Sequence, residues 1–232
     1  MRKNTLVHVV LTVALLSGCV RSAEGQHPDP AMLSGALLTI TDMPGDWRET
    51  QRQAFSTREA ENPSIDPSVW CPEAGNVTKN LVSLAGDAGA DVEMQDLSAG
   101  NGYRLMRLQA WSNDDVENYY ADAKEAVHIC DGSTETDSEG VTTSSRIIDG
   151  RDIGDESVSW EDRVTPPVAT QKEKMESVGR TTIARFGGII MVLQLGDGGM
   201  TGTASLMDED AWWSIVEKAG KKLADLDRQV HD

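Results

Sequence analysis

Histidine is scarce in this chain of 232 residues, which contains only four. His8 lies in an N-terminal apolar stretch, His27 in a polar segment and His231 at the end of the chain. Only His128 lies in the body of the sequence. We expect it near a helix end, interacting with the helix dipole rather than acting as a general base. This shortage excludes most Ser-His-Asp and Cys-His catalytic schemes.

Basic residues are also few, because 21 lysines and arginines stand against 38 acids and give a formal net charge of −17. Nucleic-acid phosphates and anionic membrane surfaces both attract positive charge. The composition therefore argues against nucleic acid as a partner and against electrostatic binding to a membrane surface. We interpret the charge as that of a soluble, self-repelling surface, with a dedicated cation site as the alternative.

Long hydrophobic runs are absent apart from one near the N-terminus, from about Thr5 to Leu16. That run is shorter than the ~20 apolar residues that cross a membrane. It follows Arg2 and Lys3, which is the order of an export signal. Its end, Leu-Leu-Ser-Gly-Cys at 15–19, resembles the lipobox of bacterial lipoproteins. A plain secretory signal cut elsewhere is the alternative.

The lipobox resemblance implies the organisation of the whole chain. Residues 1–18 would be a lipoprotein signal peptide, and cleavage would leave Cys19 as a diacylglycerol-modified N-terminus. Residues 19–34 would be a lipidated tether, and residues 35–232 an extracytoplasmic α+β domain. We therefore expect the protein at the cell membrane, lipid-anchored on the extracytoplasmic face.

Only three cysteines are present, Cys19, Cys71 and Cys130. If Cys19 carries lipid, the other two remain in an exported domain, where cysteines tend to pair. We predict a disulfide between Cys71 and Cys130, worth roughly 4 kcal/mol in the chain-entropy model. Two unrelated buried thiols are the alternative.

Strand-like patterns recur along the chain, at about 47–55, 91–97, 103–111, 141–148, 157–164, 174–186 and 189–195. Apolar residues at helical spacing predict long helices over 113–130 and 208–226, with Asn113 and Asp208 as N-caps. Ile189 to Leu193 is a continuous apolar run, typical of a central strand covered on both faces. We predict an α+β fold in which two long amphipathic helices pack on one face of a single antiparallel sheet.

Six tryptophans against two phenylalanines is an unusual balance. Trp70, Trp111 and Trp160 are candidates to line an apolar cleft, because tryptophan supplies large contact area at low entropic cost. The alternative places each of them in the core. Trp212 and Trp213 are adjacent, so we expect one under the last helix and the other at its edge.

No cofactor or metal site is expected. Asp149, Asp152, Asp155 and Glu156 crowd one segment, but their spacing is not that of an EF-hand. We interpret Gly196 to Gly202 as a glycine-rich loop, and it lacks the lysine of a phosphate-binding loop.

Several short motifs resemble actinobacterial lipoproteins related to the PknH-like extracellular sensor domain. They are Leu37-Leu38-Thr39, Asp42-Met43-Pro44, Trp47, Cys71-Pro72, Cys130, Gly154-Asp155-Glu156-Ser157 and Arg185-Phe186-Gly187. The resemblance implies a curved sheet with a cleft that binds an unknown ligand. The order Pro44-Gly45-Asp46-Trp47 departs from the family's usual Pro-x-Gly-Trp. This chain can form one disulfide where the sensor domains often have two, and it contains no kinase segment.

Together these features predict a non-catalytic, ligand-binding or sensor-like lipoprotein of the cell envelope. Its expected partners are the membrane, through the lipid, and an unknown small ligand or envelope protein. An accessory role in envelope assembly is one alternative. A cell-wall hydrolase using paired carboxylates is another, although no pattern selects two acids for it.

Overall fold

The computed structural model describes residues 27–56, 88–99, 102–148, 150–167, 175–200 and 207–232. Eight strands and three α-helices are described, together with one short 3-10 helix, η1. In chain order they are α1 (Pro30–Ala36), η1 (Ile40–Asp42), β1 (Trp47–Ser56), β2 (Ala88–Asp96), β3 (Tyr103–Ser112), α3 (Val116–Cys130), β4 (Thr134–Thr136), β5 (Thr142–Ile147), β6 (Glu156–Thr165), β7 (Met175–Phe186), β8 (Ile189–Met200) and α4 (Glu209–His231). The expected α+β class is confirmed.

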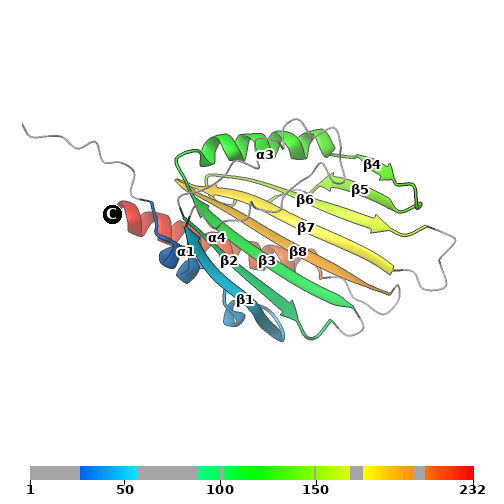
Figure 1. The fold of residues 1–232 in the computed structure, drawn as a ribbon, viewed down its shortest axis with the longest axis horizontal. Coiled ribbons are helices and arrows are strands. Elements are labelled where there is room, and N and C mark those ends of the chain that lie inside the picture. Colours follow the sequence, from blue (N-terminus) through cyan, green and yellow to red (C-terminus); the bar gives the residue numbers. More distant parts are fainter. Residues whose placement is uncertain (1–26, 57–87, 100–101, 149, 168–174, 201–206) are drawn as a thin grey trace, which may run out of the picture.

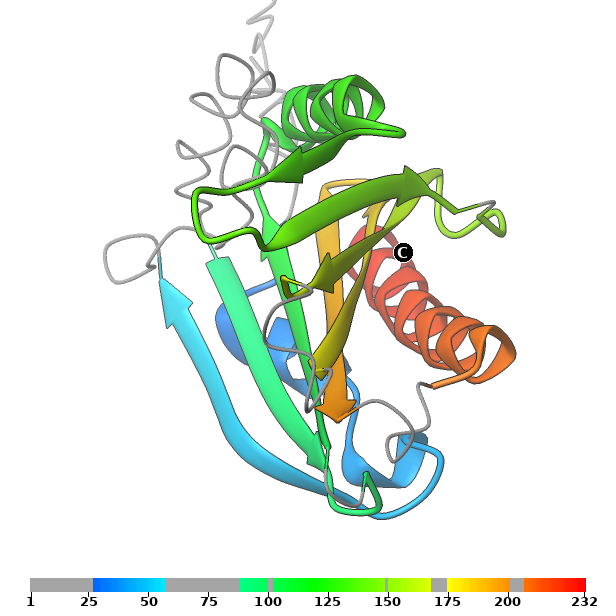
Figure 2. The ribbon, with the colours of Figure 1, turned by 90° about the vertical axis from the view of Figure 1, so that its right-hand side faces the viewer.

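The described strands form one antiparallel sheet in the order β1-β2-β3-β8-β7-β6-β5-β4. Six of the seven pairings join strands that are consecutive among those described. The exception is the pairing of β3 with β8, and the chain between these two strands builds the other half of the sheet. Figure 2 shows that the sheet is strongly twisted and curved, so β5 and β6 run across the direction of β1 and β2. The curved sheet implied by the family resemblance is thus present.

Helices cover both faces of the sheet, which corrects the expectation that they share one face. One buried cluster joins α1 and α4 to β1, β2, β3, β7 and β8. A second cluster joins α3 to the opposite face. Figures 1 and 2 show α3 and α4 on different sides of the sheet. Strand β8 contributes to both clusters, since Met191 and Leu193 belong to the first and Ile190 and Val192 to the second. The continuous apolar run in β8 is explained by this double coverage.

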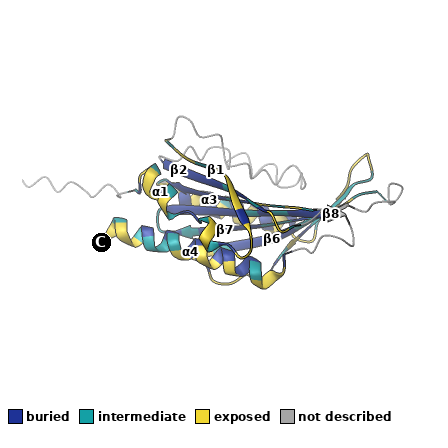
Figure 3. Ribbon diagram, turned by 90° about the horizontal axis from the view of Figure 1, so that it is seen from below, coloured by how far each residue is buried: buried dark blue, intermediate teal, exposed yellow. Residues whose placement is uncertain are grey.

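Helix α4 is the longest described element, with 23 residues. Asp208 caps it as expected, because its Oδ1 accepts a hydrogen bond from the Ala211 backbone N–H at 2.7 Å. Figure 3 shows buried residues on one side of α4 and exposed residues on the other. Trp212 and Trp213 are both buried, at 0% and 3% exposure, so the prediction that one lies at the edge is wrong. Trp213 belongs to the first buried cluster, and its Nε1 donates to Glu209 Oε1 at 3.2 Å.

Two local expectations also need correction. Helix α3 has Asp115 rather than Asn113 at its N-cap position. The Asn113 side chain instead accepts a hydrogen bond from the Asp115 backbone N–H, in a turn that precedes the helix. The glycine-rich loop was expected to begin at Gly196, which is wrong. Residues Gly196 to Met200 continue β8 and pair with β7. Gly196 and Gly198 of this segment also pair with β3 on the other side.

The packed domain begins before the expected boundary at Gly35. Asp29 caps α1 by accepting the Met32 backbone N–H at 2.8 Å, and Pro30 occupies the first helical turn. Leu33 is fully buried in the first cluster. The segment from Pro30 onward is therefore part of the domain rather than of the tether.

Candidate functional site

Polar side chains gather on the sheet face that α3 covers at one end. Strand pairing arranges alternate residues of β1, β2 and β3 in three rows, which we call the platform: Phe55–Gly89–Trp111, Gln53–Asp91–Gln109 and Gln51–Glu93–Arg107. A β-bulge between Glu49 and Gln51 shifts the register of β1 and places its three members on this face. The platform changes from aromatic to polar along the strands.

Asp91 and Arg107 form the central contact of the platform. The Asp91 side chain is fully buried, and its Oδ2 accepts from Arg107 Nε at 2.9 Å and from Nη2 at 2.5 Å. Glu93 Oε1 lies 3.6 Å from the same Nε. Arg107 is thus held by two neighbouring carboxylates of β2, and it keeps the charge of Asp91 compensated on one side.

Two buried acceptors of the platform have no partner among the described residues. They are Asp91 Oδ1 and Gln109 Oε1. Gln109 is 2% exposed, and it stands directly opposite Asp91 in the β2–β3 register. A buried acceptor without a donor costs about 1–3 kcal/mol, more when it is charged. Two such atoms side by side mark a place where a donor group is needed.

A cavity of about 400 Å³ opens over these acceptors. Its lining, which we call the amide cavity, consists of Gln51, Gln53, Ala54, Phe55, Asp91, Arg107 and Gln109. A second hollow of about 250 Å³ adjoins it on the other side of Arg107 and is lined in part by Glu93, Leu105, Gln194 and Gly196. Arg107 therefore separates two hollows on one continuous surface.

An aromatic pair closes one end of the amide cavity. The Phe55 and Trp111 rings lie with centroids 4.7 Å apart and planes at 53°. Both rings lie over Gly89, where an added Cβ would stand 2.1 Å from Phe55 and 2.8 Å from Trp111. Glycine at this position therefore allows the rings to meet and gives the cavity its apolar end.

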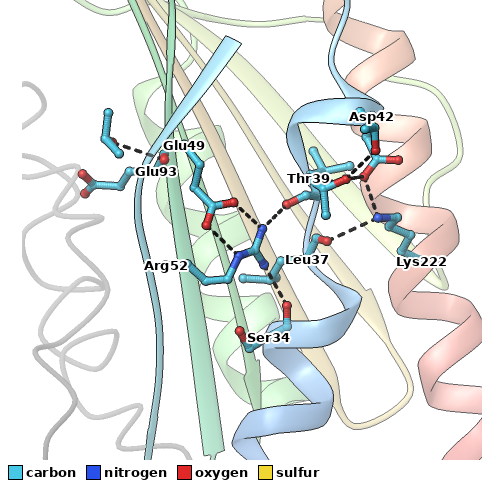
Figure 4. Close-up of polar contacts among 11 residues, drawn as sticks. Ser34, Leu37, Thr39, Asp42, Glu49, Arg52, Glu93 and Lys222 are labelled. Atoms are coloured by element: carbon cyan, nitrogen blue, oxygen red, sulfur yellow. Dashed lines mark hydrogen bonds and ion pairs between the residues drawn. The ribbon is translucent and has the colours of Figure 1, made fainter.

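The edge strand β1 that carries half of this cavity is anchored from behind, as Figure 4 shows. Arg52 donates to Ser34 O at 2.8 Å and to Leu38 O at 2.6 Å. Lys222 of α4 donates to Leu37 O at 3.3 Å and to Asp42 Oδ2 at 2.6 Å. The segment between α1 and β1 is thus hydrogen-bonded to strand β1 through Arg52 and to helix α4 through Lys222.

The carboxyl group of Asp42 has a lowered pKa at this junction. Burial alone would raise it, but the hydrogen bonds from Lys222 and Thr39 outweigh that cost. An ionised Asp42 therefore belongs to the folded state at neutral pH.

We predicted that Trp70, Trp111 and Trp160 line an apolar cleft, but neither of the two hollows described above is lined by Trp111 or Trp160. Trp111 and Trp160 are 0% and 3% exposed in the second buried cluster. Trp111 contributes indirectly through its contact with Phe55. Trp70 lies outside the described residues. The core alternative thus fits Trp111 and Trp160 better.

Two tyrosines of helix α3, Tyr119 and Tyr120, belong to this second cluster. Burial raises the pKa of Tyr120 to about 12 and that of Tyr119 still further. Both hydroxyls stay neutral, and neither has a hydrogen-bond partner within the described part of the chain. Their role here is packing.

Cys130 is buried at the C-terminal end of α3, at 4% exposure, as the sequence predicts. Cys130 is disulfide-bonded. No disulfide joins two described residues, since both Cys19 and Cys71 lie outside them. Lipid attachment at Cys19 and the pairing of Cys71 with Cys130 stay predictions.

The acidic segment before β6 is engaged within the fold. Asp155 Oδ2 accepts the Gly187 backbone N–H at 2.8 Å, and Arg185 lies near both Asp155 and Glu156. Asp149 lies outside the described residues. Within the described ranges no group of three or more His, Cys, Asp or Glu side chains could hold a metal ion.

The residues of the amide cavity were not singled out by sequence reasoning. The available signal was the alternation in β2, which places Asp91, Glu93 and Gln95 on one face, opposite Arg107 and Gln109 in the next strand. That pattern predicts a polar sheet face. It does not show that Asp91 is buried.

None of the described helices is both long and apolar enough to cross a membrane. Comparison with protein-family models and with curated proteins finds no match. Among solved structures, the chain is similar to the extracellular domain of PknH from Mycobacterium tuberculosis, with 12% identity, a TM-score of 0.46, and coverage of 89% of this chain and 98% of that one. It is also similar to LpqN, involved in cell envelope biogenesis in the same organism, with 14% identity, a TM-score of 0.31, and coverage of 75% and 78%. The PknH extracellular domain, which the sequence motifs resemble, is thus among the structures similar to this chain.

Proposed function

We propose that this chain is a lipid-anchored, extracytoplasmic protein of the cell envelope that binds a small ligand and has a sensor-like rather than a catalytic role. The proposed location at the membrane is supported by the lipobox-like stretch that ends at Cys19. The role is supported by the motifs that resemble the PknH-like sensor domain and by the amide cavity.

The amide cavity is the observation that carries the binding role. Asp91 and Gln109 present acceptors that have no partner among the described residues, in a hollow of about 400 Å³. Ligand sites combine an apolar wall with a few placed polar groups. Phe55 and Ala54 supply such a wall here, next to the polar rows of the platform.

The lining of the two hollows supports binding over catalysis. Among the described residues that line them, none is a histidine, serine or cysteine. Asp91 and Glu93 are the carboxylates present, and both lie against Arg107. Both carboxylates are thus already engaged in contacts within the protein.

The anchor is tested by Cys19→Ala in the full chain. We expect this variant to leave the membrane fraction and to lack the mass of the diacylglyceryl group. An unchanged membrane fraction and an unchanged mass would contradict the lipid anchor.

The binding role is tested by a thermal-shift screen of the chain against small amines, carboxylates, sugars and lipids. We expect at least one class to raise the melting temperature in a concentration-dependent way, since a ligand that binds only the folded state stabilises it. Gln109→Leu should weaken the shift. If no class of compound raises the melting temperature, the proposal is contradicted. If the chain degrades a cell-wall polymer and Asp91→Asn abolishes that activity, the hydrolase alternative is favoured.

A further inference from the structure

We infer that the amide cavity binds a primary ammonium group carried on a short apolar chain or ring. This inference rests on the proposed ligand-binding function and names the chemical class of the ligand. It places the ammonium against Asp91 and Gln109 and the apolar part against Phe55.

The hydrogen-bonding capacity of the cavity selects a donor. The two hydrogen bonds that Arg107 donates to Asp91 both end on Oδ2, and Oδ1 has no partner among the described residues. Gln109 Oε1 is left over on the opposing strand, among the described residues. Directly paired residues of antiparallel strands have Cα atoms about 4.5–5.5 Å apart, so one group can reach both acceptors. An ammonium offers three donors and no acceptor, which suits a site that presents acceptors.

The charge around the cavity favours a cationic donor over a neutral one. The charged side chains of the platform are Asp91 and Glu93 on β2 and Arg107 on β3, two negative groups against one positive group. Arg52 of β1 lies on the opposite face, where it donates to Ser34 and Leu38. Arg48, which pairs with Gln95 in the strand register, donates to the Gln95 side chain at 3.0 Å. An anion entering this hollow would meet Asp91 at its floor. The chain as a whole carries a net charge of −17, which raises the local concentration of cations.

The spacing of the rows sets the size of the ligand. The aromatic row and the Gln53–Asp91–Gln109 row lie two residues apart along each strand, which is about 7 Å. A ring packed against Phe55 and a nitrogen at Asp91 are therefore separated by a linker of about two carbons. The face of Phe55 also attracts a nearby cation. A compound that matches both ends is 2-phenylethylamine.

The test is isothermal titration calorimetry on the full chain in lipid nanodiscs with three probes of matched shape: 2-phenylethylamine, 2-phenylethanol and phenylacetate. We expect the amine to bind at least about tenfold more tightly than the alcohol, because the charge-assisted hydrogen bond to Asp91 is lost in the alcohol. Phenylacetate should not bind. Raising the salt concentration should weaken binding of the amine, because salt screens the attraction.

Substitutions assign the binding to this cavity. Asp91→Asn should weaken the amine at least about tenfold and bring its affinity close to that of the alcohol. Gln109→Leu keeps the volume but removes an acceptor, so we expect a loss of about threefold or more. Asp152→Asn changes an exposed acid elsewhere and should leave the affinity unchanged. If Asp91→Asn fails to fold, Gln109→Leu and Glu93→Gln carry the test in its place.

Each outcome decides the inference. Equal or tighter binding of the alcohol or of phenylacetate would overturn the ammonium assignment while leaving the proposed binding role intact. The same follows if none of the three probes binds but a compound of another class does in the thermal-shift screen. Amine binding that Asp91→Asn and Gln109→Leu leave unchanged would place the site elsewhere and also overturn the inference.

Discussion

Glu161 and Asp162 are neighbours in β6, yet the pKa values of their carboxyl groups move in opposite directions. Successive residues of a strand point to opposite faces. Burial favours the neutral form of Glu161, but Arg180 and Arg146 outweigh it and lower the pKa. Asp162 lies on the other face, where burial raises the pKa more than the hydrogen bonds from Ser145 and Trp160 lower it.

We therefore expect Glu161→Gln and Asp162→Asn to change stability with opposite signs. Glu161→Gln should cost about 2 kcal/mol at pH 7, because it weakens charged hydrogen bonds to Arg146 and Arg180. Asp162→Asn should stabilise the fold at pH 7, because an ionised buried carboxyl is replaced by a neutral group that still accepts from Trp160. Urea unfolding at pH 7 measures both.

The pH dependence of the two variants follows from the signs of the shifts. The contribution of Glu161 is present above its unfolded pKa and is lost as the pH falls through the lower folded pKa. The penalty of Asp162 is present above its raised folded pKa and disappears as the pH falls toward its ordinary value of 3.8. Both differences from the wild type should therefore vanish in acid. A penalty of Glu161→Gln that persists at low pH would contradict this account.

Arg104 joins three strands and the start of α4. Its Nη1 donates to Asp96 Oδ2 at 2.8 Å and its Nε to Asp197 Oδ2 at 3.0 Å. Asp197 Oδ2 also accepts the Met207 backbone N–H at 2.6 Å, just before the helix begins. Arg104→Met should cost about 3–5 kcal/mol in urea unfolding, because two buried carboxylates lose their cation.

The matched control for Arg104 is Arg228 in α4, which pairs with Asp225 on the surface. Its side chain is 71% exposed, and exposed pairs contribute about 0–1 kcal/mol. Arg228→Met should therefore change stability little. Similar losses for the two variants would refute the role given to Arg104.

Gly154 and Gly132 separate steric clash from backbone strain. Both have a positive φ, of 68° and 74°. An added Cβ at Gly154 would lie 2.3 Å from the carbonyl oxygen of Arg185, whereas at Gly132 it meets nothing within 4 Å. Gly132→Ala should cost about 1–2 kcal/mol, the penalty of the left-handed conformation alone. Gly154→Ala should cost clearly more, because a strand backbone must move. Thermal unfolding compares the two, and equal losses would contradict the clash.

The pairing of Cys71 with Cys130 is open to a direct measurement. We expect non-reducing peptide mapping to recover the two cysteines in one linked fragment, and reduction to lower the free energy of unfolding by roughly 4 kcal/mol. Cys130→Ser should have the same effect as reduction. Recovery of a free thiol at Cys71 in the oxidised protein would refute the pairing.

Much of the secondary structure follows from local sequence. Asp208 begins α4 where a cap and two acids precede an apolar stripe, and Gly187 turns β7 into β8 with a φ of 52°. These features depend on residues within one or two turns of each other, so periodicity and turn chemistry are enough to predict them. The same is true of the burial of Cys130 at the end of α3.

The position of each helix on the sheet was not available from the sequence. An apolar stripe shows that a helix packs on something, but it does not show which face of the sheet receives it. The apolar run from Ile189 to Leu193 predicts that both faces of β8 are covered. It does not show which helix covers which face.

The candidate site depends on long-range pairing in the same way. The β3–β8 pairing brings Arg107 beside Gln194 across a large gap in sequence, and the bulge in β1 decides that Gln51 and Gln53 share a face with Asp91. The sequence by itself determined the local elements, the acidic charge and the expected export signal, because these depend on composition and near neighbours. Only the tertiary structure decided that Asp91 and Gln109 are buried acceptors at the floor of a cavity, because burial is set by the strands and helices that pack around a residue.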